Sequence, residues 1–239
     1  MSDRVLAVIP ARFGAQRFPG KPLALLWGKP MLQHVWERAQ AAHGIDRLIV
    51  ATDDERIAAA ARGWGAEVAM TSPACASGTD RVAEVARAHA ECAVVLNIQG
   101  DEPELETSSL SELAETMKAH PEILMGTIAH RELDDAAMAN ENVVKVRLDA
   151  EAFATSFTRS GAAQAGAPPL RHAGVYAFRR DLLLEFAAWP QGELEKRERL
   201  EQLRAVERGV KIKVVIGDQS FSGVDTPEQM AALEARGPR

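Results

Sequence analysis

Short apolar runs alternate along the chain with amphipathic segments of helical period. The first run, residues 5–9, leads into a polar loop and then into a helical pattern over about 31–42. A second run at 47–52 precedes a helical pattern over 54–62, and another strand is expected at 66–70. Because strands that alternate with helices build parallel sheets covered on both faces, this order predicts an α/β fold with a doubly wound, mostly parallel sheet.

The same pattern continues, less regularly, through the rest of the chain. A helix is expected over 79–90, and the nearly continuous apolar run at 93–98 is typical of a strand that is covered on both faces. Strands are also expected at 143–148, 172–178 and 211–216, together with a long charged helix at 195–208 and a last helix at 227–236. No internal repeat is found, so we interpret residues 1–239 as a single domain. The low-complexity stretch 160–169 predicts a flexible loop or linker.

The composition excludes several classes of protein. The 239 residues include 28 basic and 34 acidic ones, and without a second basic patch this acidic balance argues against nucleic acid as a partner. No segment approaches the ~20 apolar residues of a membrane span, and the first apolar run is too short for a signal peptide. Cys75 and Cys92 show no metal-ligand spacing and are expected to be reduced thiols. We therefore expect a cytoplasmic protein.

The loop after the first strand carries the strongest chemical signal. It contains Arg12, Arg17 and Lys21 and no acidic residue, against the trend of the whole chain. Glycines and basic side chains after a buried strand are suited to a nucleoside triphosphate, although a plain solvated loop is the alternative. The loop is not a Walker A motif, because five residues separate Gly14 from Gly20 and a proline follows the lysine. Any metal ion must therefore be held by residues elsewhere.

Two aspartates are candidate metal ligands. Asp101 comes just after the strand at 93–98, and ligands bind doubly wound sheets at the carboxyl ends of their strands. Pro227 suits the first position of the last helix, with Thr226 as its N-cap and Gln229 as capping-box partner, which leaves Asp225 available. Two carboxylates together with phosphate oxygens are what Mg²⁺ requires on a nucleotide. Simple turn and helix-terminus roles are the alternatives.

Taken in order, these segments resemble the 3-deoxy-manno-octulosonate cytidylyltransferase family, the CMP-Kdo synthetases. The resemblance covers nearly the whole chain and rests on these motifs: Ile9-Pro-Ala-Arg12, Arg17-Phe-Pro-Gly-Lys-Pro-Leu23, Ser77-Gly-Thr-Asp-Arg81, Asn97-Ile-Gln-Gly-Asp-Glu-Pro103, Asn142-Val-Val-Lys145, His172-Ala-Gly-Val-Tyr176, Leu200-Glu-Gln-Leu-Arg204 and Gly223-Val-Asp-Thr-Pro227. It implies transfer of CMP from CTP to the anomeric hydroxyl of a 3-deoxy-ulosonic acid (Kdo), with release of pyrophosphate, for lipopolysaccharide biosynthesis. It also implies Mg²⁺, a homodimer, and a nucleotide-diphospho-sugar transferase-like fold in which about 125–178 contributes a smaller sugar-binding or dimerisation lobe.

The resemblance also assigns roles to individual residues. Arg12 and Lys21 would act on the triphosphate, with Arg17 close by. Asp101 and Asp225 would be the magnesium ligands. The nucleotide pocket would be completed by Pro10, Ala11, Ser77 and Arg81. The sugar-acid pocket would be lined by Gln99, Arg159, His172, Glu201 and Gln202.

One segment departs from the family pattern and leaves more than one acceptor open. After Phe157-Thr-Arg159-Ser160 the family usually continues into a longer insertion with proline and aromatic residues, whereas this chain passes through a Gly/Ala/Pro stretch to His172. A related acid, such as 8-amino-Kdo or sialic acid, is therefore an alternative acceptor. Two further hypotheses are a sugar-1-phosphate nucleotidyltransferase and a non-catalytic nucleotide-binding module. For the main hypothesis we expect direct attack of the sugar 2-hydroxyl on the α-phosphorus, with no Ser or Cys nucleophile.

Overall fold

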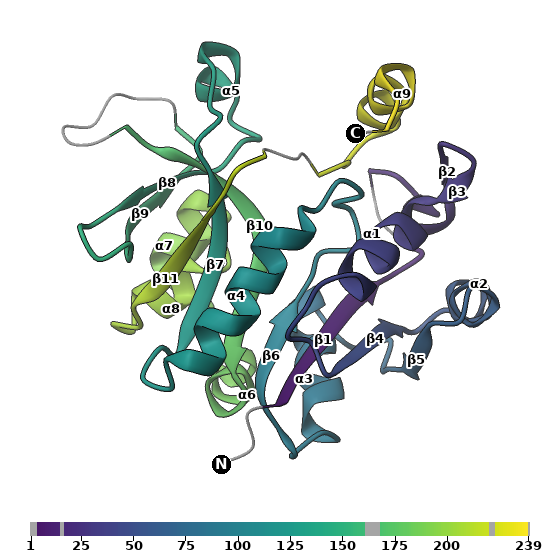
Figure 1. Cartoon of the computed structure of the whole chain (residues 1–239), viewed down its shortest axis with the longest axis horizontal. Coiled ribbons are helices and arrows are strands. Elements are labelled where there is room, and N and C mark those ends of the chain that lie inside the picture. The colour runs from purple at the N-terminus through teal and green to yellow at the C-terminus, as the bar shows by residue number, and fades with distance from the viewer. Residues whose placement is uncertain (1–3, 15–16, 161–167, 220–222, 239) are drawn as a thin grey trace.

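In the computed structural model, a large mixed sheet runs through the molecule between two layers of helices (Figure 1). The structure describes residues 4–14, 17–160, 168–219 and 223–238. The strands found among these residues in this sheet are β1 (Arg4–Ala11), β4 (Arg47–Thr52), β5 (Glu67–Met70), β6 (Cys92–Asn97), β7 (Met125–His130), β8 (Lys145–Leu148), β9 (Ala154–Thr158), β10 (Leu170–Arg179) and β11 (Ile212–Gly217). Most of the predicted linker at 160–169 lies outside the described residues.

The order of the strands is β11-β7-β10-β6-β1-β4-β5, and β8 and β9 extend the sheet from β10. Strand β1 is parallel to both of its neighbours, β4 and β6, and the pairs β4–β5 and β7–β11 are also parallel. Strand β10 is antiparallel to both β6 and β7. The predicted α/β fold with a mostly parallel sheet is confirmed. Strands β7 and β10, which belong to the range of about 125–178, are part of the central sheet. The smaller lobe that was expected from this range stays a prediction.

Helices cover both faces because the central strands are apolar on both sides. Val5, Ala7 and Ile9 of β1 pack into one core cluster, whereas Leu6 and Val8 pack into the opposite one. The first cluster includes residues of α1 (Met31–Gln40), α2 (Glu55–Gly63) and α4 (Thr107–Ala119). The second includes residues of α3 (Gly78–Arg87), α6 (Arg180–Ala188), α7 (Glu193–Glu198) and α8 (Leu203–Val206). No helix in the described part of the chain is long and apolar enough to cross a membrane.

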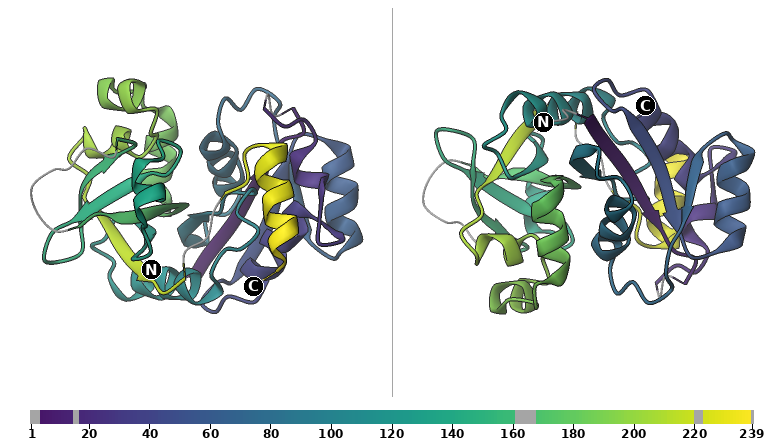
Figure 2. Two further views of the ribbon diagram at one scale, coloured as in Figure 1. Left: turned by 90° about the horizontal axis from the view of Figure 1, so that it is seen from above. Right: turned by 90° about the horizontal axis from the view of Figure 1, so that it is seen from below.

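The C-terminal helix α9 (Pro227–Arg236) returns to the N-terminal part of the chain (Figure 2). It begins as predicted, with Thr226 as N-cap and Gln229 in the capping box. Met230 and Leu233 of α9 pack on Leu26, which belongs to the small hairpin of β2 (Leu25–Leu26) and β3 (Lys29–Pro30). Docking of α9 therefore brings the residues just before it close to the basic loop.

The prediction of a single helix over 195–208 is wrong. The chain forms two short helices, α7 and α8, interrupted at Arg199, which has a left-handed backbone with φ of 55°. The physical reason is a buried ion pair in which Arg204 Nη2 lies 2.6 Å from Glu195 Oε1. These residues are nine positions apart and would lie on opposite sides of a continuous helix. Burial opposes ionisation of Glu195, but hydrogen bonds from Arg204 outweigh it and lower the pKa of Glu195.

This ion pair yields a prediction for stability. We expect Arg204→Met to lower the free energy of unfolding by about 3–5 kcal/mol, because it leaves the buried carboxylate of Glu195 without its partner. The double variant Glu195→Leu/Arg204→Met should regain part of this loss, since it buries no unpaired charge. Urea denaturation of the three proteins measures the effect. Equal stability of Arg204→Met and the unmodified protein would show that the pair contributes nothing.

Candidate active site

Two cavities meet at the carboxyl ends of β1 and β6. The basic-loop cavity, of about 570 Å³, is bounded by the loop that follows β1. The β10 cavity, of about 810 Å³, is bounded by the start of β10 and by the segment before α8. Gln99, Asp101 and Asp225 line both cavities. A ligand in one cavity can therefore reach a ligand in the other at these three residues.

The structure brings together each of the two groups of residues that the sequence predicted. Those assigned to the nucleotide all line the basic-loop cavity: Pro10, Ala11, Arg12, Arg17, Lys21, Ser77 and Arg81. Those assigned to the sugar acid all line the β10 cavity: Gln99, Arg159, His172, Glu201 and Gln202. Their positions agree with the predicted division of the site, and their individual roles stay predictions.

Asp101 and Asp225 converge on one cationic group, the side chain of Lys21. The Nζ atom of Lys21 lies 2.7 Å from Asp101 Oδ2 and 3.5 Å from Asp225 Oδ1. It also donates a hydrogen bond of 2.8 Å to the carbonyl oxygen of Val224. Arg17 Nη2 lies 3.1 Å from Asp225 Oδ1, so the two aspartates share a strongly positive environment.

These oxygen atoms fit a hard divalent cation. Asp101 and Asp225 offer two carboxylates that already point at one position, and Val224 adds a carbonyl oxygen nearby. The described residues contain no cluster of three or more His, Cys, Asp or Glu side chains that could hold a metal ion. An ion here would need phosphate oxygens and water to complete its coordination, which is the usual arrangement for Mg²⁺ on a nucleotide.

Close packing of two loops places the acidic and basic groups side by side. Gly100 lies against the end of β1, where a Cβ atom would be 3.1 Å from the carbonyl oxygen of Pro10 and 3.1 Å from Leu32. A side chain at this position would require Pro10 or Leu32 to move by a few tenths of an ångström. Lys21 begins a 3₁₀ turn (Lys21–Leu23) directly after Gly20, whose φ of 73° favours glycine. Gly100 therefore permits the close approach of the two loops, and Gly20 permits the turn before Lys21.

Arg81 and Ser77 occupy the side of the basic-loop cavity formed by the start of α3. Arg81 is only 4% exposed, forms an ion pair of 3.2 Å with Asp53, and donates a hydrogen bond to Thr71. Its guanidinium is thus held in place before any ligand binds. Ser77 is the N-cap of α3 and exchanges hydrogen bonds with Asp80 in a capping box. Ser77 therefore has a structural role in addition to its place in the cavity.

A chain of hydrogen bonds connects the shared wall with the segment before α8. Gln99 donates to Asn97 over 3.2 Å, Asn97 donates to Thr79 over 3.1 Å, and Thr79 donates to Glu201 over 2.5 Å. Burial raises the pKa of Glu201, although the hydrogen bond from Thr79 acts in the opposite direction. The next residue, Gln202, is buried, and its Nε2 atom has no hydrogen-bond partner in the described structure. Gln202 does not lie on a solvated helix face.

Lys145 fixes the wall of the β10 cavity near Arg159. It is 1% exposed and donates hydrogen bonds of 2.7 Å to Asn140 O and 2.9 Å to Arg159 O. The Arg159 side chain donates to the carbonyl oxygen of Glu141 over 3.2 Å. The side chains of Lys145 and Arg159 thus connect the segment 140–141 with the end of β9. No role for Lys145 was predicted from the sequence, although it ends the motif that begins at Asn142.

His172 forms part of the floor of the same cavity. Its Nε2 atom lies 2.9 Å from the hydroxyl oxygen of Thr127, and its ring makes an edge contact with Phe157. Because the Thr127 hydroxyl donates to the carbonyl oxygen of Val175, we assign the proton to Nε2 of the imidazole. Burial, with a smaller effect from His130, lowers the pKa of His172 to about 3. The imidazole is therefore neutral at physiological pH.

Two buried carboxyl groups close to Asp101 were missed, because the sequence analysis considered only Asp101 in this segment. Glu102 is 7% exposed and Glu104 is 8% exposed, and both line the β10 cavity. Each has one carboxyl oxygen without a hydrogen-bond partner among the described residues. Glu104 also pairs with Arg236 of α9. Burial, with the nearby charge of Asp101 adding to it, raises the pKa of Glu102 to about 8.

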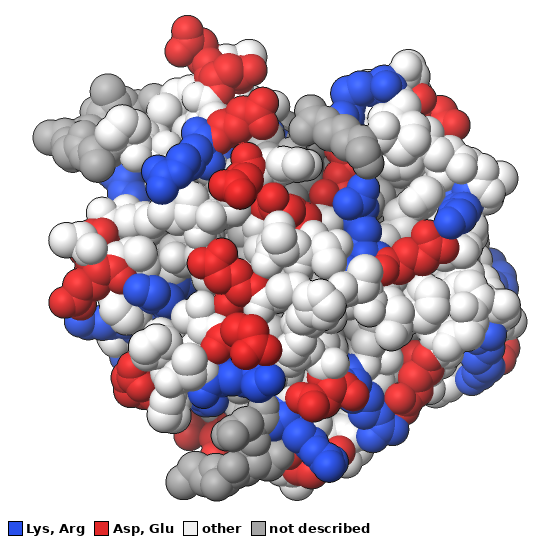
Figure 3. Space-filling view, viewed as in Figure 1, with Lys and Arg blue, Asp and Glu red and all other residues white. Residues whose placement is uncertain are grey.

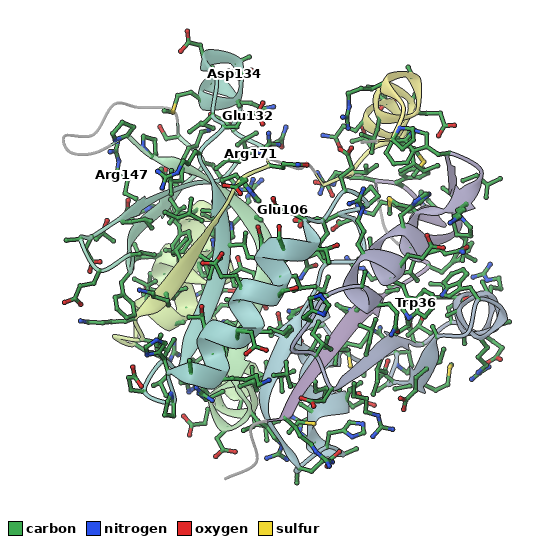
Figure 4. All side chains as sticks on the ribbon, viewed as in Figure 1. Trp36, Glu106, Glu132, Asp134, Arg147 and Arg171 are labelled. Atoms are coloured by element: carbon green, nitrogen blue, oxygen red, sulfur yellow. The ribbon has the colours of Figure 1, made fainter. Side chains whose placement is uncertain are left out.

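Acidic and basic side chains surround the opening between the helix α5 (Asp135–Ala139) and α9. In the space-filling view, acidic side chains gather around this hollow, with basic side chains on its α9 side (Figure 3). Glu132 and Asp134 lie at the α5 rim above Arg171, the second residue of β10 (Figure 4). All three line the β10 cavity, so its mouth carries charges of both signs.

Comparisons with known proteins agree on the kind of protein that carries this site. A family model described as cytidylyltransferase matches residues 6–212. The chain is 45% identical over 235 residues to the 3-deoxy-manno-octulosonate cytidylyltransferase of Solibacter usitatus, with 96% of this chain and 93% of that protein covered. It is 43% identical over 239 residues to the 8-amino-3,8-dideoxy-manno-octulosonate cytidylyltransferase of Shewanella oneidensis, with 97% and 98% covered. A solved structure of CMP:2-keto-3-deoxy-manno-octonic acid synthetase complexed with CTP matches with a TM-score of 0.91 at 37% identity, and 98% of each chain is covered.

The lowered pKa of His172 yields a prediction for acid stability. The unfolded chain binds a proton near pH 6.5, whereas the folded protein resists protonation until about pH 3, so stability should fall as the pH drops through this window. We expect His172→Asn to reduce this pH dependence by on the order of 1 kcal/mol per pH unit. Urea denaturation at pH 7 and pH 5 measures it, with the exposed His43→Asn as control. An unchanged slope in His172→Asn would contradict the assignment of a neutral, half-buried imidazole.

Proposed function

The chain belongs to the family of 3-deoxy-manno-octulosonate cytidylyltransferases, and we propose that it transfers CMP from CTP to the anomeric hydroxyl of a 3-deoxy-ulosonic acid, releasing pyrophosphate. One observation carries the proposal. The cavity lined by the predicted nucleotide residues meets the cavity lined by the predicted sugar residues at Asp101 and Asp225. Direct transfer requires the α-phosphorus and the attacking hydroxyl to meet at one point, and the junction supplies such a point.

The basic-loop cavity supports the assignment of the triphosphate. Arg12, Arg17 and Lys21 line it, and their charges would offset those of the phosphates and of the departing pyrophosphate. Asp101 and Asp225 would hold Mg²⁺, because their carboxylates converge on one position. When bound, Mg²⁺ supplies Lewis-acid stabilisation of the phosphate charge. Lys21 would then serve the phosphates, and the buried Arg81 would keep that wall of the cavity rigid.

The β10 cavity favours a polyhydroxylated acid over a sugar phosphate as the acceptor. Its acidic lining residues are Asp101, Glu102, Glu104, Glu132, Asp134, Glu201 and Asp225, and its basic ones are Arg159, Arg171, Arg199 and Arg236. Glu102, whose pKa is about 8, is largely neutral near pH 7, but the other six acidic residues still outnumber the four basic ones. This excess repels the two negative charges of a phosphate monoester more strongly than one carboxylate. Kdo is the acceptor that we propose, and 8-amino-Kdo is the second candidate because relatives at 43% identity carry that activity in their names.

The cellular setting of the enzyme is part of the proposal. We infer from the family that the enzyme acts in the cytoplasm as a homodimer and provides an activated sugar for lipopolysaccharide biosynthesis. The acidic composition agrees with a partner that is a small molecule and not a nucleic acid. Size-exclusion chromatography with light scattering tests the dimer, and a mass of about one chain at working concentration would refute it.

A pyrophosphate-release assay tests the proposed reaction. The protein would be incubated with Mg²⁺ and either CTP or UTP, and with Kdo, 8-amino-Kdo, sialic acid or a sugar 1-phosphate. We expect release with CTP and an octulosonic acid only, and loss of release when Mg²⁺ is chelated. Binding of CTP without release for any acceptor would identify a non-catalytic nucleotide-binding module.

Asp225 provides a test of the two-aspartate site. We expect Asp225→Asn to reduce turnover by at least about 100-fold, because the neutral amide no longer supplies a carboxylate to the cation. The melting temperature should stay close to that of the unmodified protein, since the exposed ion pair between Arg17 and Asp225 adds little stability. Glu228→Gln, an exposed carboxylate on the first turn of the same helix, is the matched control. Near-normal pyrophosphate release by Asp225→Asn would remove the proposed metal role.

A further inference from the structure

We propose that Glu102 binds the acceptor, through a hydrogen bond between its buried Oε2 atom and a hydroxyl group of the sugar acid in the β10 cavity. This inference rests on the proposed function, because that function supplies the acid that occupies the cavity. Neither the sequence motifs nor the position of the metal site required a role for Glu102.

A bulge in β10 holds the side chain of Glu102. Ala173 pairs with Ile128 of β7, but the next pair is Tyr176 with Thr127, so two residues of β10 have no partner in the ladder. Such bulges release backbone groups from their regular hydrogen bonds. The freed N–H of Gly174 donates to Glu102 Oε1 over 2.9 Å. One carboxyl oxygen of Glu102 is therefore fixed by the backbone.

The absence of a side chain at Gly174 lets the carboxyl group of Glu102 lie close to the bulge. A Cβ atom at this position would be 2.8 Å from Glu102 Oε1 and 3.2 Å from Cγ of Gln99. Any other residue would push the glutamate or the glutamine away from β10. The side chain of Glu102 is thus held in one position, with its second oxygen away from the backbone contact.

The second oxygen of Glu102 lacks a hydrogen-bond partner among the residues that the structure describes. Glu102 is only 7% exposed, and its Oε2 atom forms no hydrogen bond with any described residue. Buried carboxyl oxygens are normally hydrogen-bonded, so a partner from outside the chain is expected. Glu102 lines the β10 cavity, where a ligand can provide that partner.

The chemistry of this oxygen selects a hydroxyl group. A carboxylate oxygen needs a donor, whereas a protonated carboxyl also needs an acceptor. A hydroxyl can donate and accept, so it satisfies Oε2 in either form of Glu102. Phosphate and carboxylate groups would be repelled by ionised Glu102, and ammonium could not accept from the protonated form. A polyhydroxylated acid therefore matches the position better than a purely anionic ligand.

The location of Glu102 predicts which of the two substrates a Glu102 variant should bind more weakly. Asp101 lines both cavities, whereas Glu102 lines only the β10 cavity. Removal of the Glu102 hydrogen bond should therefore weaken acceptor binding without changing CTP binding. An indirect effect through the neighbouring Asp101 would change the dependence on both CTP and Mg²⁺.

Steady-state kinetics of two Glu102 variants provide the test. We expect Glu102→Met, which keeps the volume but forms no hydrogen bond, to raise the KM for the acceptor about tenfold. The KM for CTP and the Mg²⁺ dependence should stay unchanged. Glu102→Gln should stay within about threefold of the unmodified protein, since its amide can still bond Gly174 N–H and the hydroxyl. Glu112→Gln, on the exposed side of α4, is the control.

Acceptor analogues that each lack one hydroxyl give a second test that does not depend on folding of a variant. One analogue should bind the unmodified protein about tenfold more weakly, and in Glu102→Met that analogue and the complete acid should have similar KM values. If no analogue loses binding to the unmodified protein, the inference is wrong. It is also wrong if Glu102→Met leaves the acceptor KM unchanged or raises the KM for CTP equally. Failure of the unmodified protein to release pyrophosphate with any acid would instead reject the proposed function, and this inference with it.

Discussion

The convergence of Asp101 and Asp225 is the constraint on which the rest of the site depends. Asp225 must reach Lys21, which lies 204 positions earlier in the chain. The backbone N–H of Val224 donates to Asp101 O over 2.8 Å, and the apolar face of α9 packs on the β2–β3 hairpin. At its far end, Glu234 accepts a hydrogen bond of 2.6 Å from the N–H of Trp27. Asp225 is thus positioned by contacts along the whole C-terminal segment.

This arrangement also divides the charges of the site. Among the described residues that line the basic-loop cavity, Arg12, Arg17, Lys21 and Arg81 are basic and only Asp101 and Asp225, at the junction, are acidic, which suits a triphosphate. The β10 cavity has more carboxyl than guanidinium groups, and several of its polar atoms are buried and lack partners among the described residues, notably Glu102 Oε2 and Gln202 Nε2. Such a surface suits a ligand with many hydroxyl groups and one carboxylate. The two cavities therefore differ in the chemistry that they can bind, and the aspartates lie where they meet.

Local sequence patterns were sufficient to predict the strands of the N-terminal half and the capping of α9. Most of the residues that gather in the two cavities were instead implied by the family resemblance. Long-range contacts explain what was missed. Arg199 adopts a left-handed backbone because Glu195 and Arg204 pair across the break, and no periodicity reveals that pair. The antiparallel direction of β10 and its bulge depend on β6 and β7. Lys145 and Glu102 become informative only when their burial is known, since their residue types are ordinary on a surface.

Crystallographic location of a divalent ion tests the central claim most directly. The protein would be crystallised with CTP and Mn²⁺ in place of Mg²⁺, and the ion located by its anomalous scattering. We expect a peak in direct contact with carboxyl oxygens of both Asp101 and Asp225, with the side chain of Lys21 turned to the phosphates. An ion bound only by phosphates and water, with the two aspartates separated, would contradict the proposed site.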